Sequence, residues 1–329
     1  MQSDSETAAI PVAVVIGGES GEHEISLRSG SEVFAAIDRT HFAPFLIRIE
    51  RDGAWTFPDA PRAEAPQLQL WEGVRELQRR APAVVFPAMH GPYGEDGRFQ
   101  SLLELCHLRY VGSGPEASAL AMNKARGRDI LAAAGLNVAP AQELRGVDEL
   151  RLKAPCVVKP LRLGSSVGLM VVREQAALED ALRDAFTHDH RVLVEQFVEG
   201  TEITGGVLET VSGEPEALPI VEIRPTGSAF FDYHAKYTPG ATDEICPAPI
   251  SDELTRAAQN AALVAHTALD CRGVSRTDFI ADATGKLWVL ETNTLPGLTQ
   301  QSLLPKAAKA AGIDFEALVD RLIRRALDS

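Results

Sequence analysis

The stretch of sequence that decides the fold is Arg276-Thr-Asp-Phe-Ile-Ala-Asp-Ala-Thr-Gly-Lys-Leu-Trp-Val-Leu-Glu-Thr-Asn293. Its alternation of apolar and polar residues predicts two strands joined by a turn at Ala283-Thr-Gly285. A loop formed by the two residues Thr284 and Gly285 would set the register of the strands. The opposed pairs would then be Asp278 with Glu291 and Arg276 with Asn293.

These four side chains would share one face of the hairpin, because successive side chains of a strand point to opposite faces. Two carboxylates, an amide oxygen and a guanidinium would converge there. Oxygen ligands of this kind suit Mg²⁺, which usually keeps several waters and binds substrate phosphates. The alternative is a solvated hairpin with scattered charges, because a bulge in the ladder would break the register.

The composition describes a globular chain of 329 residues with 45% apolar content, which is enough for two or three packed domains. No run approaches the roughly 20 apolar residues of a membrane span, and the polar segment Met1–Ala9 lacks the features of a signal peptide. The net charge of −14 argues against a nucleic-acid surface but leaves room for a small anionic substrate. The cysteines lie far apart without a C-x-x-C pair, which favours a reducing cytoplasm and a structural role. They are Cys106, Cys156, Cys246 and Cys271.

Strands and helices alternate in the first part of the chain, which predicts a parallel α/β sheet. The ligands of such sheets bind beyond the carboxyl ends of the strands, where Gly17-Gly18 and His90-Gly91 lie. The predicted strands are 11–16, 42–49, 83–86 and 109–111, and the predicted helices are 24–37 and 98–106.

A separate small domain is predicted next, with the order strand, loop, strand, helix, strand. A helix at 117–134 precedes it, and its own elements are strands 156–160, 168–172 and 191–195 with a helix at 175–185. From about Thr201 the chain alternates strands, a loop at 233–245, a helix near 253–269, the opening hairpin and a last helix.

Three glycine-containing segments are candidates for ligand contact. Gly164-Ser-Ser-Val-Gly168 lies between two strands, and its backbone N–H groups can form an anion nest that covers phosphates, although it is equally an ordinary hairpin turn. His90-Gly-Pro-Tyr-Gly-Glu-Asp-Gly97 follows a strand end, where its histidine has either a ligand-binding or a structural role. Gly17-Gly-Glu-Ser-Gly-Glu-His-Glu24 does not spell G-x-G-x-x-G, and its glutamates suit a substrate ammonium group better than a pyrophosphate.

Single charged residues outside these segments indicate function less specifically than the glycine-containing segments do. Lys124 and Lys159 flank the small domain and would, taken alone, be solvated surface charges. Glu195 ends an apolar strand before Gln-Phe-Val198, where backbone groups either pair with a purine edge or simply end the strand.

Five motifs occur in a fixed order along the chain. They are Gly17-Gly-x-Ser-x-Glu-x-Glu-Ile-Ser26, His90-Gly-Pro-Tyr-Gly-Glu-Asp-Gly97, Val158-Lys-Pro160 with Gly164-Ser-Ser-Val-Gly168, Ala235-Lys-Tyr237, and Glu291-x-Asn-Thr-x-Pro-Gly297. From about residue 11 onward the chain resembles the D-alanine–D-alanine ligases of the ATP-grasp superfamily. The resemblance implies an α/β fold, in which an N-terminal Rossmann-like (pre-ATP-grasp) parallel-sheet domain precedes a two-domain ATP-grasp α+β fold. The implied domains are 1–120 for substrate, 121–200 for the small ATP-grasp domain, and 201–329 for the metal and catalytic residues.

The resemblance also implies a nucleotide site. Lys124 and Lys159 would hold phosphates, Glu195 and Val198 would bracket the adenine, and Glu202 would bind the ribose. Ser165, Ser166 and the loop amides would close over the β- and γ-phosphates, which Lys236 would also reach. Asp278, Glu291 and Asn293 would hold two Mg²⁺ (or Mn²⁺) ions.

The resemblance also implies which residues bind the substrates and take part in catalysis. Glu24 would bind the ammonium of the first D-alanine, with His90 near its carboxylate and Tyr237 linking Glu24 to Ser165. Arg276 and the Gly297 amide would bind the oxyanion, while Ser302 and the Leu303 amide would hold the second carboxylate.

The implied activity is ATP-dependent ligation of two D-alanines through an acylphosphate, for peptidoglycan precursors, by a cytoplasmic homodimer without nucleic-acid or membrane partners. The chain departs from many relatives at Leu163, where glutamate is common, and at Gln196, where lysine is common. Both changes could alter ATP affinity or loop closure. Two alternatives are a ligase joining other D-amino or hydroxy acids and a non-catalytic nucleotide-binding protein. A redox dinucleotide enzyme is disfavoured because G-x-G-x-x-G is absent.

Overall fold

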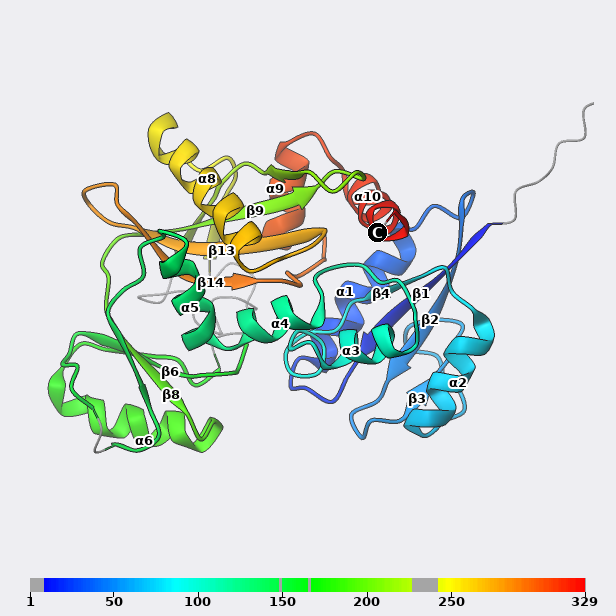
Figure 1. The fold of residues 1–329 in the computed structure, drawn as a ribbon, viewed down its shortest axis with the longest axis horizontal. Helices are drawn as coiled ribbons and strands as arrows, with labels where there is room; N and C mark the ends of the chain where they lie inside the picture. The colour runs from blue at the N-terminus through cyan, green and yellow to red at the C-terminus, as the bar shows by residue number, and fades with distance from the viewer. Residues whose placement is uncertain (1–8, 148–149, 165–166, 227–241, 329) are drawn as a thin grey trace, which may run out of the picture.

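The computed structural model describes residues 9–147, 150–164, 167–226 and 242–328, arranged around three sheets (Figure 1). The first sheet has the order β3-β2-β1-β4, in which β1 pairs in parallel with both β2 and β4 and β3 runs antiparallel to β2. Its strands are β1 (Ile10–Gly17), β2 (Phe42–Ile49), β3 (Trp55–Thr56) and β4 (Val84–Pro87), and its helices are α1 (His23–Ala36), α2 (Leu70–Arg80) and α3 (Arg98–Leu105). β1 is buried almost throughout because both faces of this parallel sheet are covered. The predicted parallel pairing is confirmed for strands 11–16, 42–49 and 83–86, whereas the strand predicted at 109–111 is a single bridge between Tyr110 and Val85.

The second sheet is antiparallel and has the order β5-β8-β6-β7, with α6 packed on one face. Its elements are β5 (Ala141–Leu144), β6 (Cys156–Pro160), β7 (Met170–Val172), a short 3₁₀ helix η2 (Gln175–Ala177), α6 (Leu178–His188) and β8 (Val192–Gln196). The single helix predicted at 117–134 is wrong. The structure has α4 (Pro115–Met122) and α5 (Lys124–Ala133), separated at Asn123, whose side chain caps α5 by accepting a hydrogen bond from the Arg126 N–H.

The third sheet has the order β12-β11-β9-β13-β14, with β10 paired to β9. Its strands are β9 (Thr201–Glu209), β10 (Pro215–Ala217), β11 (Val221–Pro225), β12 (Thr242–Ile245), β13 (Val274–Ala281) and β14 (Leu287–Asn293), and α8 (Asp252–Ala268) covers it. Two helices close the chain where one was predicted, namely α9 (Leu303–Ala310) and α10 (Phe315–Leu327).

The β13–β14 hairpin confirms the predicted pairs but not the predicted loop. Asp278 lies opposite Glu291 and Arg276 opposite Asn293, whereas Ala281 already pairs with Leu287, so the loop is longer than Thr284–Gly285. A bulge offsets the change of register that the longer loop causes. Phe279 pairs with Val289, and the next pair is Asp278 with Glu291. Leu290 is therefore an extra residue, and the four predicted side chains still share a face.

One hydrophobic core joins the first and last parts of the chain. Leu318, Leu322 and Ile323 of α10 belong to the same buried cluster as Val14 and Val84 of the first sheet, and Figure 1 shows α10 beside α1 and β4. This packing brings the segment before α9 to α1, where the Gln300 N–H donates to Glu32 at 2.7 Å. In the described part of the chain, no helix is long and apolar enough to cross a membrane.

Candidate active site

A pocket lies between the second and third sheets and holds about 960 Å³ of space, counted out to its open mouth. One wall comes from β6, β7 and the end of β8, and the other from β13 and β14. The apolar residues that line it include Val157 and Val171 on the first wall and Ile280, Trp288 and Val289 on the second. Two opposed apolar walls form a slot suited to a flat ring system.

The same pocket gathers charged side chains. Its cations are Lys124, Arg128 and Lys159, and its carboxylates are Glu195, Glu202, Asp278 and Glu291. Lys124 donates to the Leu163 carbonyl at 2.6 Å and lies 3.4 Å from Glu291. The predicted nucleotide residues Lys124, Lys159, Glu195, Val198 and Glu202 therefore line one pocket together with the predicted metal ligands Asp278 and Glu291.

The edge of the pocket beyond β8 offers a backbone donor. The N–H groups of Gln196 and Phe197 donate to the carbonyls of Pro140 and Pro155. Within the described residues, no acceptor takes the next N–H, that of Val198, which lines the pocket. Glu195 differs from the prediction in one respect, because its side chain is buried and bonded to Arg128 and Lys159.

Arg276 and Asp278 form a two-point ion pair on the hairpin face. Nε and Nη2 of Arg276 lie 2.9 and 2.8 Å from the two Asp278 oxygens, and the Thr204 hydroxyl donates to Asp278 at 2.5 Å. Burial alone would lower the pKa of Arg276, but the attraction of Asp278, with help from Glu291, raises it. Arg276 is therefore a permanent cation at this face.

The oxygen donors of the hairpin face fit a metal ion only with additional ligands. Among the described residues, no group of three or more His, Cys, Asp or Glu side chains converges as a metal site. The set predicted here has two carboxylates, Asp278 and Glu291, and the amide of Asn293, which lies on the same face. Mg²⁺ is commonly held by one or two carboxylates with waters and substrate phosphates, so these residues fit an ion that arrives with a phosphate ligand.

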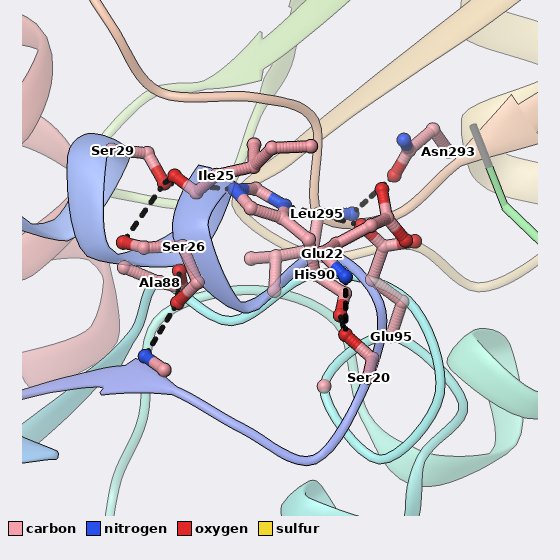
Figure 2. Close-up of polar contacts among 12 residues, drawn as sticks. Ser20, Glu22, Ile25, Ser26, Ser29, Ala88, His90, Glu95, Asn293 and Leu295 are labelled. Atoms are coloured by element: carbon pink, nitrogen blue, oxygen red, sulfur yellow. Dashed lines mark hydrogen bonds and ion pairs between the residues drawn. The ribbon is translucent and has the colours of Figure 1, made fainter. Parts of the chain in front are cut away.

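A second polar cluster lies at the carboxyl ends of β1 and β4 (Figure 2). His90 is buried, with Nε2 2.8 Å from the Ser29 hydroxyl and Nδ1 3.3 Å from Glu95. The Ser20 hydroxyl donates to the His90 carbonyl at 2.7 Å, which joins the two predicted loops. Both ring nitrogens of His90 thus have protein partners, which fix its orientation.

Glu24 does not lie where the prediction placed it. Its side chain is exposed and pairs with Arg62 at 3.0 Å and Arg51 at 3.7 Å, and the Arg62 hydrogen bond lowers its pKa. Glu22 is the glutamate that faces the cluster. A Cβ added to Gly91 would stand 2.3 Å from a Glu22 oxygen, and one added to Gly164 would stand 3.3 Å away.

The reason for this correction is the start of α1. The helix begins at His23, so Glu24 belongs to its first turn and points outward, while Glu22 is the N-cap residue beside the glycine turn. The helix was predicted to begin at residue 24, one residue late, so the sequence pattern did not separate Glu22 from Glu24.

The segment before α9 forms a third part of the site. Ser302 is the N-cap of α9, and its hydroxyl accepts from the Thr299 N–H at 3.2 Å. A Cβ added to Gly297 would stand 3.0 Å from this hydroxyl, so Gly297 and Ser302 are neighbours. Leu303 is the first residue of α9, and a helix N-terminus is a favourable place for a carboxylate. At the end of β14, the side-chain oxygen of Asn293 accepts a hydrogen bond from the Leu295 N–H at 2.9 Å (Figure 2). This bond orders the chain at the start of the segment that leads to α9.

Four predicted site residues lie outside the described residues, namely Ser165, Ser166, Lys236 and Tyr237. The structure also adds residues that the sequence reasoning missed, and these are Glu22, Ser29, Glu95, Arg128 and Thr204. Of these, Arg128 carried a usable signal, because it lies four residues after Lys124 and so on the same face of a helix.

The chain matches two protein families along most of its length. The family described as "D-ala D-ala ligase N-terminus" matches residues 11–113, and the one described as "D-ala D-ala ligase C-terminus" matches residues 131–324. The D-alanine–D-alanine ligase of Syntrophobacter fumaroxidans is 43% identical over 98% of this chain and 99% of its own, and that of Geotalea uraniireducens is 40% identical over 96% and 95%.

Two solved structures have the same fold. The VanG D-Ala:D-Ser ligase of Enterococcus faecalis superposes with a TM-score of 0.82 at 31% identity, over 97% of this chain and 99% of that one. The D-alanine–D-alanine ligase of Coxiella burnetii gives a TM-score of 0.82 at 30% identity, over 97% and 94%. These superpositions confirm the predicted α/β fold class with its ATP-grasp part. The chain belongs to the D-alanine–D-alanine ligase family.

Proposed function

We propose that this protein joins two D-alanine molecules to D-alanyl-D-alanine at the expense of ATP, releasing ADP and phosphate, for peptidoglycan precursors. The observation that carries the proposal is the pocket between the second and third sheets. It combines apolar walls with Lys124, Lys159 and the opposed Asp278 and Glu291. This combination suits a base at one end and phosphates at the other.

The nucleotide is placed by these groups. The adenine enters the slot between Val171 and Trp288, and its edge accepts from the Val198 N–H. Glu202 binds the ribose, and Lys124 and Lys159 hold phosphates. Ser165, Ser166 and Lys236 complete the phosphate site in this proposal.

Asp278, Glu291 and Asn293 would hold two Mg²⁺ or Mn²⁺ ions with the phosphates, and the bound ions would neutralise charge between the phosphates and a substrate carboxylate. Arg276 orients the Asp278 carboxylate through its two-point ion pair. Thr204 fixes the same carboxylate from the neighbouring strand.

The first D-alanine lies between the cluster of Figure 2 and Arg276. Glu22 takes over the ammonium-binding role predicted for Glu24, because it is the glutamate that faces this space. His90, held by Ser29 and Glu95, lies near the substrate carboxylate. That carboxylate attacks the γ-phosphate, which yields an acylphosphate and ADP.

The second D-alanine binds at the N-terminus of α9, where Ser302 and the Leu303 amide receive its carboxylate. Its amine attacks the acyl carbon, a C–N bond forms, and phosphate leaves with the C–O bond electrons. The amine proton is lost to a base. Arg276 and the Gly297 amide stabilise the oxyanion that develops, and Tyr237 with Ser165 links the loops that exclude water.

A second candidate function has a specific observation in its favour. The D-Ala:D-Ser ligase VanG shares the fold over nearly the whole chain, so the second substrate could be another small D-amino or hydroxy acid. Phosphate release measured with D-alanine alone, then with added D-serine or D-lactate, separates the two. Mixed products exceeding D-alanyl-D-alanine at equal concentrations would favour the second function.

The central test is ADP formation from ATP that depends on both D-alanine and Mg²⁺, with the dipeptide identified by mass spectrometry. We expect activity to vanish in excess chelator and to return with Mg²⁺ or Mn²⁺. Nucleotide binding without D-alanine-dependent ADP formation would instead identify a non-catalytic protein.

Three further parts of the proposal concern organisation. We propose that domain boundaries lie near residues 120 and 200, that two copies assemble, and that the protein is cytoplasmic. Sedimentation equilibrium tests the assembly, with a mass of twice 35.4 kDa as the expected result.

A further inference from the structure

Three buried charged side chains meet on the wall of the nucleotide pocket. Glu195 receives Nη1 of Arg128 on one oxygen and Nζ of Lys159 on the other, each at 2.6 Å. All three side chains are at least 92% buried. Arg128 also donates to the Ala139 carbonyl, which anchors it to the chain segment before β5.

This cluster has one carboxylate for two cations. A buried carboxylate is strongly unfavourable unless a cation and hydrogen bonds compensate it. Lys159 alone would satisfy Glu195, so Arg128 is not needed while the pocket is empty of phosphate. The need arises when Lys159 turns toward a phosphate, because Glu195 would then keep no cationic partner.

The geometry points to Arg128 as a positioning residue that neutralises Glu195 permanently and so leaves Lys159 available to the phosphates of the nucleotide. This inference rests on the proposed function only in taking ATP as the ligand. Arg128 itself cannot follow the phosphate, because its second bond to Ala139 holds it in place.

The helix that carries Arg128 supports this division of roles. Lys124 and Arg128 are one turn apart on α5 and share the face that lines the pocket. Lys124 lies by Leu163 and Glu291, at the end that holds the predicted metal ligands. Arg128 lies by Glu195, so the two cations of α5 pair with two different carboxylates of the pocket.

The test measures ATP binding by calorimetry with Mg²⁺ and without D-alanine, together with KM and kcat. In Arg128→Met we expect ATP affinity to fall about tenfold or more, about 1.4 kcal/mol. We expect kcat at saturating ATP and the KM for D-alanine to stay within about twofold, since the nucleotide pocket alone is changed. Arg128→Lys should restore most of the affinity, because a lysine keeps the charge. The matched control is Arg126→Met, two residues away, exposed and paired with Asp129.

The decisive variant removes both charges. Arg128→Met keeps the Glu195–Lys159 pair, whereas Arg128→Met/Glu195→Gln leaves no carboxylate in the cluster to hold Lys159, so Lys159 stays available to the phosphates without Arg128. We expect it to bind ATP within about threefold of Glu195→Gln, since neighbouring charges are strongly coupled.

Two results would overturn the inference. One is unchanged ATP affinity in Arg128→Met, and the other is a loss of about tenfold or more when Arg128→Met is added to Glu195→Gln, which would make Arg128 a direct ligand. Failure of the unaltered protein to bind ATP would be a different result, because it removes the proposed function and this inference together.

Discussion

Glu22 and Glu24 are two residues apart but face different surroundings. Glu22 faces Gly91 and Gly164 inside the site, while Glu24 forms exposed pairs with Arg51 and Arg62. We expect Glu22→Gln to raise the KM for the first D-alanine about tenfold or more, because hydrogen bonds to charged groups are worth about 1.5–3 kcal/mol.

Glu24→Gln is the matched control, and it should leave both kinetic constants within about twofold, since exposed ion pairs contribute little. Initial rates over a range of D-alanine concentrations at saturating ATP measure both variants. The reverse pattern, with Glu24→Gln impaired and Glu22→Gln normal, would restore the original assignment.

Arg276 should matter for turnover more than for stability. Its side chain, 14% exposed, is paired with Asp278, and the raised pKa of Arg276 keeps it charged throughout the working pH range. Removing one oxyanion donor typically costs about 2.7–4 kcal/mol of transition-state stabilisation, so Arg276→Ala should lower kcat about a hundredfold or more. Arg126→Ala, at an exposed position, is the control. Near-normal turnover in a folded Arg276→Ala protein would contradict the assignment.

Single residues were predicted correctly where the two-residue repeat of a β-strand decides to which face a side chain points. Alternation along the hairpin put Asp278 and Glu291 on one face, whereas their direct pairing depended on the loop and the bulge, whose effects on the register cancel. The prediction failed at Glu24, because the first turn of a helix changes direction within two residues and motif matching alone does not locate the start. Arg128 was missed because its role depends on Glu195, which is 67 positions away in the chain.

At the scale of elements, α1 owes its position to a close approach at Gly30. A Cβ added there would stand 2.1 Å from Ile16 and 3.3 Å from Ala88, on β1 and directly after β4. Alanine is the better helix former by about 1 kcal/mol, yet we expect Gly30→Ala to destabilise the protein by about 1–3 kcal/mol, because the helix must move off the sheet.

Urea unfolding of Gly30→Ala checks this, and Gly146→Ala is the control, since a Cβ there meets nothing within 4 Å. The displaced helix carries Ser29, which holds His90, so the KM for D-alanine should rise as well. A stability equal to or above that of the unaltered protein would show that α1 packs differently.

The hairpin shows how an element can be predicted correctly for an incomplete reason. Asp282 organises the turn, because its carboxylate accepts from the N–H groups of Thr284 and Lys286, and this makes the loop longer than predicted. The bulge at Leu290 then shifts the register back by one residue. Neither feature was visible in the pattern of apolar residues, and their effects on the register of Asp278 and Glu291 cancel.

At the scale of the whole molecule, the sequence indicated three groups of elements but not how they pack. A single last helix was expected where α9 and α10 lie, and no apolar pattern states which sheet the face of such a helix covers. The structure places α10 on the first sheet, so the chain ends share one core. That packing brings the N-terminus of α9 to α1 and completes the site from distant segments.

Glu209 links several of these segments through buried bonds. Its carboxylate lies 2.6 Å from Arg325 of α10 and 3.3 Å from His266 of α8, and His266 reaches Ser275 of β13 at 2.8 Å. Burial alone would raise the pKa of Glu209, but the hydrogen bonds from His266, the Gly273 N–H and Arg325 outweigh it and lower the pKa below 4.5. The ionised form is therefore the one that stabilises the fold.

Replacing Glu209 by glutamine should destabilise the protein by about 1–3 kcal/mol near neutral pH, because Arg325 loses its buried partner. A group with a lowered folded-state pKa contributes fully above its unfolded value of 4.5 and loses that contribution as the pH falls through the folded value. The gap between the unfolding free energies of the two proteins should therefore narrow as the pH falls from about 6 to about 3. Urea titrations at each pH measure the gap, with Glu316→Gln, exposed on α10, as the control. A gap that stays constant over this range would mean that the lost stability comes from shape rather than from the charge of Glu209.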